Sequence, residues 1–278
     1  MHLHIAMSPD PDDRFMVWAL QSGRLPTGPY RFTFEAAPTD ALNLIASRGG
    51  ADVCAISMAH YPKIAAEYQL LPHGGSLGEG YGPVVVAPQP MSLADLHGRR
   101  VGIPGTSTTA WAVLRMMAEV EPVHTPISPY HLIFDAIAEG RVDAGLLIHE
   151  GRLTYADHGL HLVADLGVWW REHVGPLPLP LGGNVIRRSL GPQVIRDVSS
   201  LLRQSIALAL EHQDEAIAWL HSQGIALGSS DDVRHYLSLY ANARTLDYGD
   251  DGRKGIEVFF ERAAQAGVLP PAPIDYAP

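Results

Sequence analysis

The sequence predicts an α/β fold of two lobes, each with a mixed sheet and flanking helices, with a ligand cleft between the lobes. A pattern of helix, glycine, aspartate among small residues, and aliphatic strand occurs twice, in residues 41–56 and 134–148. Extended segments near Val85 and near Gly183 carry the chain from one such region to the other and back. Residues 192–266 then have helical periodicity. Two α/β segments followed by helices are the plan of a type II periplasmic-binding-protein-like fold.

The length and composition suit two lobes that share one chain. The protein has 278 residues, of which 46% are hydrophobic and 18% charged, so it can bury a substantial core. We expect a discontinuous first lobe of residues 1–86 and 184–278, which includes the C-terminal helices, and a second lobe of residues 87–183.

The elements follow from short aliphatic runs and from helical periodicity. Ser8 to Asp13 form a turn in which prolines fix the backbone, and Asp13 is a candidate cap for the next helix. The runs predict strands at residues 3–7, 30–37, 51–57, 84–87, 99–103, 141–148, 162–167 and 184–188, and the periodic segments predict helices at residues 14–21, 39–47, 111–118 and 130–138.

The repeated pattern places the same residue types at matching positions. Aligning Gly49 with Gly140 superposes Asp52 on Asp143. In both copies a glycine stops a helix, and the aliphatic run that follows is typical of a strand buried on both faces. We therefore expect two similar α/β units, each presenting the end of a strand to a shared cleft.

The second copy ends at a histidine, because the aliphatic run of residues 141–148 stops at His149. Ligands bind at the carboxyl ends of strands in parallel sheets. An imidazole has an ordinary pKa near neutrality and can accept a proton from a substrate. His149 is therefore the candidate general base, and a purely structural histidine is the alternative.

A run of hydroxyl residues follows another predicted strand and opens an apolar helix. Backbone N–H groups at a helix start attract anions, and neighbouring hydroxyls add donors. Ordinary helix capping accounts for one or two such residues. We expect this segment to bind an anionic ligand through Ser107, Thr108, Thr109 and Ala110.

Several specific motifs follow one another along nearly the whole chain. The strongest is Gly-Leu-x-Ile-His-Glu-x-Arg-x-Thr-Tyr at residues 145–155. The others are the Ser-Pro-x-Pro-x-Asp-x-Phe opening at 8–15, Asn43, Ser57, the glycine-rich stretch 74–83, Thr108-Thr109-Ala110, Asp-Leu-Gly-x-Trp-Trp at 165–170 and Leu-Pro-Leu-Pro-Leu-Gly at 177–182. Together, in this order, these motifs resemble those of the 1,4-dihydroxy-6-naphthoate synthases of the futalosine route to menaquinone.

The resemblance implies a lyase that splits cyclic de-hypoxanthine futalosine into 1,4-dihydroxy-6-naphthoate and dihydroxyacetone, with no metal or organic cofactor. It also implies that His149 is the base. On this reading the substrate contacts Asn43 and the segment Ala55-Ile56-Ser57, whose backbone groups add to the Ser57 hydroxyl. If one ligand contacts both lobes, binding should favour a closed state.

The sequence departs from the family pattern at a few positions. The family's common opening has Cys, Asn and Thr where this chain has Asp10, Asp12 and Arg14, and a frequent lysine is replaced by Ala55. These changes alter the charge near the predicted ligand and leave His149 unchanged.

Composition excludes several classes of partner. The formal net charge of -10, with dispersed acidic residues, argues against nucleic acid and anionic membranes. A single cysteine, Cys54, excludes an intrachain disulfide and a thiolate metal cluster. No membrane span or leader is visible, so we expect a cytoplasmic monomer or homodimer that acts on a small anionic substrate.

Two other functions suit the same fold. One is a non-catalytic solute-binding protein for a small carboxylate, which would normally need export. The other is chorismate dehydratase, a sister enzyme of the same pathway, whose resemblance around Ile148-His149-Glu150 is weaker.

Overall fold

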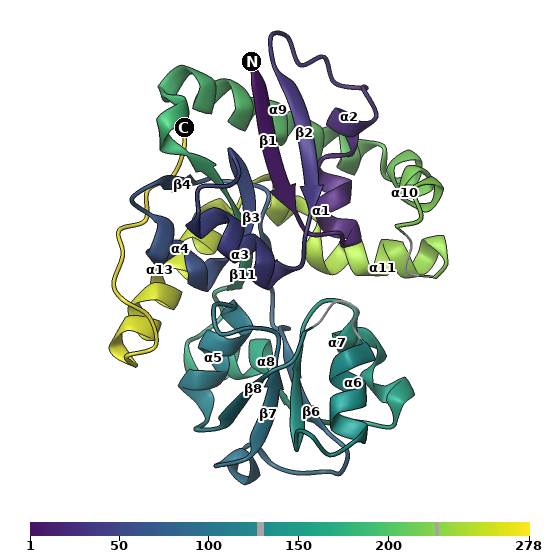
Figure 1. The fold of residues 1–278 in the computed structure, drawn as a ribbon, viewed down its shortest axis with the longest axis vertical. Helices are drawn as coiled ribbons and strands as arrows, with labels where there is room; N and C mark the ends of the chain where they lie inside the picture. The colour runs from purple at the N-terminus through teal and green to yellow at the C-terminus, as the bar shows by residue number, and fades with distance from the viewer. Residues whose placement is uncertain (127–130, 226–227) are drawn as a thin grey trace. The chain divides into compact units, whose positions relative to one another are not determined.

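A computed structural model describes residues 1–126, 131–225 and 228–278 of the chain (Figure 1). The described residues form two compact units. The first unit comprises residues 1–77, 182–253 and 272–278, and the second comprises residues 78–181 and 254–271. Each unit has its own sheet and flanking helices, which confirms the predicted α/β class. The predicted lobe boundaries, residues 1–86 with 184–278 and residues 87–183, stay a prediction.

The sheet of the first unit has the order β2-β1-β3-β11-β4, with β5 paired to β11. β1 is parallel to β2 and β3, whereas β11 runs antiparallel to β3 and β4. Two of the points at which the chain passes between the units fall within strands, β5 and β11. The strands are β1 (His2–Met7), β2 (Arg31–Ala36), β3 (Val53–Ser57), β4 (Tyr68–Leu70), β5 (Ser76–Gly78) and β11 (Leu179–Arg187).

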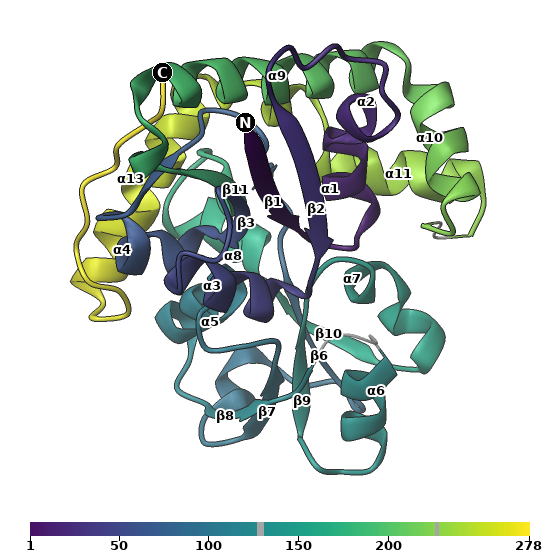
Figure 2. The ribbon, with the colours of Figure 1, turned by 45° about the horizontal axis from the view of Figure 1, so that its top comes forward.

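Helices cover both faces of this sheet (Figure 2). On one face, Ile5 and Val53 pack with Val198 and Leu202 of α9. On the other face α3 packs against β3, and the Cys54 thiol lies against the Leu42 carbonyl of α3. The helices that lie wholly within this unit are α1 (Pro11–Met16), α2 (Trp18–Gln21), α3 (Thr39–Ser47), α4 (Tyr61–Ile64), α9 (Pro192–Glu211), α10 (Gln213–Ser222), α11 (Ser230–Tyr240) and α12 (Ala243–Leu246), with 3-10 turns at Met58–His60 and Arg188–Leu190.

The sheet of the second unit has the order β10-β6-β9-β7-β8. β7 is parallel to β8 and β9, and β6 is antiparallel to β9 and β10. Val84 of β6 and Leu147 of β9 pack with Ile133, Phe134 and Ile137 of α6. The strands are β6 (Val84–Ala87), β7 (Arg100–Ile103), β8 (Glu121–His124), β9 (Ala144–Leu147) and β10 (His161–Asp165).

The helices of the second unit are short, apart from the one that enters it from the first. That helix, α13 (Gly249–Gln265), begins in the first unit, and its residues from Lys254 onward belong to the second. The predicted first residue of α6, Tyr130, lies outside the described residues. The other helices are α5 (Thr109–Met117), α6 (His131–Ala138), α7 (Gly151–Thr154) and α8 (Leu166–His173), with 3-10 turns at Leu93–Leu96 and Tyr155–His158.

The repeated sequence pattern corresponds to a repeated local structure. The Asp52 carboxylate accepts a hydrogen bond from the His4 N–H at 2.9 Å, and its own N–H donates to the His4 carbonyl at 2.9 Å. Asp143 makes the same two bonds with Arg100, at 3.0 and 2.8 Å. In both copies the glycine after the helix is left-handed, with φ of 63° and 68°. The aspartate therefore sets the start of the strand against its parallel neighbour in each unit.

The first helix begins earlier than the sequence predicts. α1 starts at Pro11, and Asp10 rather than Asp13 occupies the position before it. Proline suits this position because its φ is fixed near the helical value and its missing N–H has no partner there in any case. Asp13 instead accepts a hydrogen bond from the Ser8 N–H at 2.6 Å. The expected capping role of Asp13 is therefore wrong.

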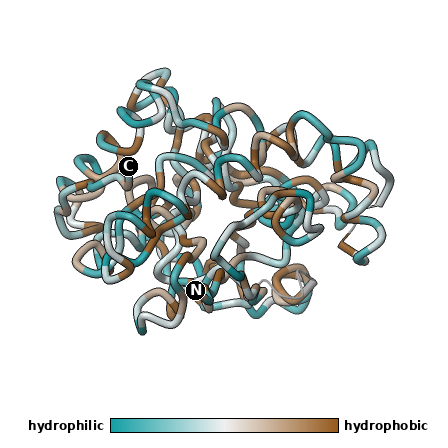
Figure 3. Tube along the Cα trace, turned by 90° about the horizontal axis from the view of Figure 1, so that it is seen from above, coloured by the Kyte–Doolittle hydropathy of each residue, from teal (hydrophilic) through white to brown (hydrophobic). Residues whose placement is uncertain are grey.

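Hydropathy varies over short distances along the chain (Figure 3). Within residues 1–126, 131–225 and 228–278, none of the helices combines the length and the apolar character of a membrane span.

Candidate active site

Two of the predicted contact residues of the first unit form a buried pair. Asn43 lies on α3 and Ser57 is the last residue of β3, and their exposed fractions are 1% and 4%. The Asn43 side-chain oxygen accepts from the Ser57 N–H at 3.0 Å, and its amide donates to the Ser57 hydroxyl at 3.3 Å. The pair therefore fixes both the backbone and the hydroxyl of Ser57 at the carboxyl end of a strand.

The segment Ala55-Ile56-Ser57 lies where one ladder of β3 ends and the other continues. The parallel ladder with β1 ends at Cys54, whereas the antiparallel ladder with β11 continues to Ser57. Beyond Cys54, one edge of β3 therefore no longer pairs with β1. This is the arrangement expected if backbone groups of residues 55–57 contribute to binding.

A buried histidine supports the Asn43 side of this pair. Ser47 donates its hydroxyl proton to the Asn43 carbonyl at 2.9 Å, and His60 Nε2 lies 2.8 Å from the same hydroxyl. Because the Ser47 proton is already donated, the His60 ring supplies the proton of the second bond. Burial lowers the pKa of His60 to about 4. A neutral imidazole thus anchors the end of α3, and this partner does not appear among the predicted site residues.

In the second unit the hydroxyl-rich segment forms the start of α5. Thr108 is the N-cap, because its hydroxyl oxygen accepts from the Trp111 N–H at 3.2 Å and its proton goes to the Gly105 carbonyl at 2.9 Å. Thr109 donates its hydroxyl to the Leu181 carbonyl at 2.7 Å. Both threonine protons are donated to backbone carbonyls, so the backbone N–H groups are the more direct anion donors of this helix start. Ser107 and Ala110 flank the two threonines.

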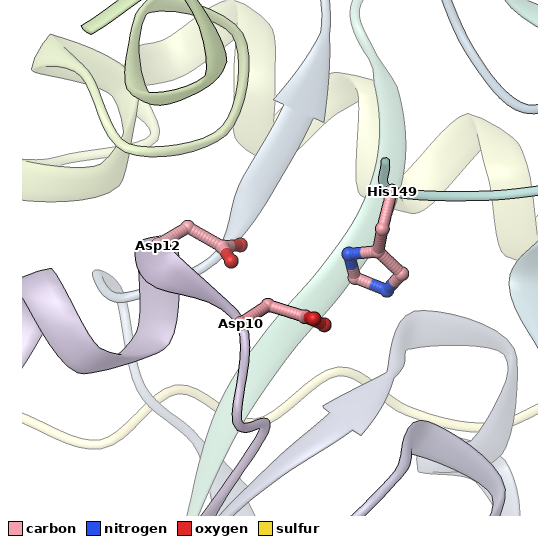
Figure 4. A group of neighbouring side chains, drawn as sticks. All are labelled: Asp10, Asp12 and His149. Atoms are coloured by element: carbon pink, nitrogen blue, oxygen red, sulfur yellow. The ribbon is translucent and has the colours of Figure 1, made fainter. Parts of the chain in front are cut away.

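His149 stands on the short connection between β9 and α7 (Figure 4). Its φ is 49°, and among the described residues other than glycine it is the one whose φ is positive. A side chain in this left-handed conformation is uncommon and costs about 1 kcal/mol or more. The His149 carbonyl accepts from the Arg152 N–H at 3.2 Å, which closes the turn into α7. The chain thus holds this histidine in a strained conformation at the end of a buried strand.

Arg152 and Asp165 form an ion pair that sequence reasoning did not assign to the site. Arg152 Nη2 donates to Asp165 at 2.8 Å, and the two side chains are 18% and 12% exposed. The available signal was their presence in two separate motifs of the family resemblance, 13 residues apart.

Three aspartates lie at the start of α1, and two of them, Asp10 and Asp12, are shown in Figure 4. Asp12, 5% exposed, accepts from the Tyr236 hydroxyl at 3.1 Å, and Asp10 accepts from the Ser8 hydroxyl at 2.5 Å. Burial and, after it, the negative charge of Asp12 raise the pKa of Asp13 well above its ordinary value. These bonds give two of the departures from the family opening, Asp10 and Asp12, a role within the first unit.

The sequence matches the family model described as menaquinone biosynthesis over residues 3–265. The chain belongs to this menaquinone biosynthesis family. A 1,4-dihydroxy-6-naphthoate synthase from Thermus thermophilus is 38% identical, over 98% of this chain and 97% of that protein. A solved structure of a protein from Archaeoglobus fulgidus has a TM-score of 0.87 at 37% identity, covering 96% of this chain and 98% of that one. These matches confirm the resemblance drawn from the motifs.

A more distant structure bears on the fold alone. The alkanesulfonate-binding protein SsuA from Xanthomonas axonopodis has a TM-score of 0.68 at 14% identity, covering 97% of this chain and 94% of that one. The predicted periplasmic-binding-protein-like fold is therefore confirmed.

Proposed function

We propose that the protein is a 1,4-dihydroxy-6-naphthoate synthase that acts in menaquinone biosynthesis. The observation that carries the proposal is the match to a synthase of this name at 38% identity over nearly the full length of both chains. The reaction proposed is the one implied by the motif resemblance: cleavage of cyclic de-hypoxanthine futalosine into 1,4-dihydroxy-6-naphthoate and dihydroxyacetone.

His149 is the proposed general base. Breaking a carbon–carbon bond next to a carbonyl requires a group that accepts a proton, and donors that stabilise the negative charge developing on oxygen. The position of His149 after β9 and its strained backbone support this role, because strained residues gather at functional sites.

Substrate contacts are proposed for both units. In the first, the paired Asn43 and Ser57, with the backbone of Ala55 and Ile56, present polar groups at the end of β3. In the second, the start of α5, residues 107–110, offers N–H groups to an anionic group of the substrate. That one substrate contacts both sets of residues stays a prediction.

The two alternatives receive less support. A solute-binding protein shares the fold, but the likeness to SsuA at 14% identity concerns the fold alone. The name of the Thermus relative favours the synthase over chorismate dehydratase. The cytoplasmic location and the monomeric or dimeric state stay predictions.

One assay separates these functions. The purified protein is incubated with cyclic de-hypoxanthine futalosine, and the naphthoate and dihydroxyacetone are quantified by liquid chromatography. Stoichiometric formation of both products is the expected result. Saturable binding without products would favour a solute-binding protein, and dehydration of chorismate in a parallel incubation would favour the sister enzyme.

A further inference from the structure

The connection that carries His149 is short and is fixed at its first end. β9 ends at Leu147 and α7 begins at Gly151, so residues 148–150 alone join them. Leu147 is held in the antiparallel ladder opposite Val84 of β6. The left-handed φ of His149 therefore persists only if the second end of the connection is also held.

Arg152 holds that second end through its guanidinium. Nε donates to the Gly82 carbonyl at 2.7 Å, and Nη2 donates to the Asp165 carboxylate at 2.8 Å. The guanidinium also lies 5.4 Å from the centre of the Tyr81 ring. One side chain thus joins the first turn of α7 to the segment before β6 and to the end of β10. A planar fork of donors suits this double contact, which lysine cannot reproduce.

The groups that accept hydrogen bonds from Arg152 are themselves held in place. The second Asp165 oxygen accepts from the N–H groups of Gly167 and Val168 at 2.8 and 3.2 Å, which caps α8. A Cβ on Gly167 would lie 2.0 Å from the Tyr81 carbonyl carbon, so the two backbones are in direct contact. Arg152 is therefore anchored to backbone and to a helix cap rather than to mobile side chains.

We infer that Arg152, held by Asp165, is a positioning residue that keeps His149 in its left-handed conformation and its imidazole oriented for proton transfer. The inference rests on the proposed role of His149 as base. Without the guanidinium, residues 148–152 relax toward ordinary backbone angles and the imidazole loses its fixed direction. A misplaced base slows the chemical step while leaving most substrate contacts intact.

The kinetic test uses Arg152→Gln and Arg152→Lys, with Arg141→Gln as the matched control. Arg141 pairs with Glu139 in the same unit but is 54% exposed. We expect Arg152→Gln to lower kcat about 10- to 100-fold and to change KM less than about threefold. The kcat of Arg152→Lys should lie between the values of Arg152→Gln and the unmodified protein. Arg141→Gln should retain full activity. Circular dichroism melting confirms that each variant is folded, and Arg152→Lys, which keeps the charge, carries the test if Arg152→Gln does not fold.

A double variant separates positioning from a general structural effect. If Arg152 acts through His149, then Arg152→Gln added to His149→Asn lowers kcat no further than His149→Asn alone. Multiplicative losses would overturn the inference, as would unchanged kcat in Arg152→Gln.

An independent measurement does not depend on the reaction. In protein with ¹⁵N-labelled histidine, the His149 signals are assigned by their absence in His149→Asn. We expect Arg152→Gln to shift or broaden those signals and Arg141→Gln to leave them unchanged. Unperturbed signals would overturn the positioning role. A perturbed signal in a protein without synthase activity would instead reject the proposed function and keep the positioning role.

Discussion

The side-chain amide of Asn43 makes two hydrogen bonds to Ser57: its oxygen accepts from the Ser57 N–H at 3.0 Å, and its nitrogen donates to the Ser57 hydroxyl at 3.3 Å. Both residues are almost fully buried, so water has little access to the groups that form these two hydrogen bonds. The amide thus links α3 to the end of β3 and sets the direction in which the end of that strand presents its polar groups.

Replacing Asn43 by alanine should cost more stability than replacing Ser57. Asn43→Ala leaves the buried Ser57 N–H without its acceptor, and we expect a loss of about 1–3 kcal/mol in the free energy of unfolding. Ser57→Ala keeps that bond and loses only the longer one, from the Asn43 amide to the hydroxyl at 3.3 Å, so we expect a smaller loss of about 1 kcal/mol. Urea unfolding of both variants measures the difference. Equal losses in the free energy of unfolding would show that the hydrogen bond from the Ser57 N–H contributes no more than the bond to the Ser57 hydroxyl.

Replacing His149 by asparagine should remove proton transfer while preserving the fold. We expect kcat to fall at least ~10²-fold, the usual scale for general base catalysis. The control is His161→Asn, an exposed histidine at the start of β10 in the same unit. Steady-state turnover of cyclic de-hypoxanthine futalosine gives the comparison. Near-normal turnover in folded His149→Asn would assign the base to another residue.

Two buried histidines should make stability depend on pH. Burial lowers the pKa of His60 and His73 to about 4, from the ordinary value of 6.5 in the unfolded chain. The unfolded state therefore binds more protons between these values, so stability is complete above about pH 6.5 and falls as pH decreases toward 4.

The size of this effect is of the order of 3 kcal/mol for each histidine, since one pKa unit corresponds to about 1.4 kcal/mol. Urea midpoints between pH 4 and pH 7.5 measure it. We expect the slope to flatten in His73→Gln and to stay unchanged in His97→Gln, whose side chain is 75% exposed. An equally steep slope in both variants would contradict the assignment to His73.

Gly167 should tolerate no side chain. A Cβ there would lie 2.0 Å from the Tyr81 carbonyl carbon, and backbone cannot move aside as a flexible side chain can. We expect Gly167→Ala to lose more than about 4 kcal/mol or to fail to fold. Gly151→Ala is the matched control, because its Cβ would meet neighbours at 3.5 Å or more. Thermal melting of both variants tests the contrast, and similar melting temperatures would contradict the close approach.

Elements whose side chains are buried on both faces could be predicted from the sequence. β3, β7 and β9 read as aliphatic runs because a strand between two layers of helices has no polar face. The helix, glycine and aspartate pattern likewise identified a repeated unit, since each part has its own local physical cause. His149 followed as a candidate base because it comes directly after such a strand.

The other features depend on contacts between residues far apart in the sequence. β4, β5 and β8 are short and owe their pairing to neighbouring strands, so no local pattern marks them. The bonds from Arg152 to Asp165 and Gly82 join residues 13 and 70 positions apart, and the Asn43 and Ser57 pair joins a helix to a strand. A sequence shows which groups can donate and accept. Only the folded chain decides which partner comes within hydrogen-bonding distance, because that choice depends on how separate elements pack.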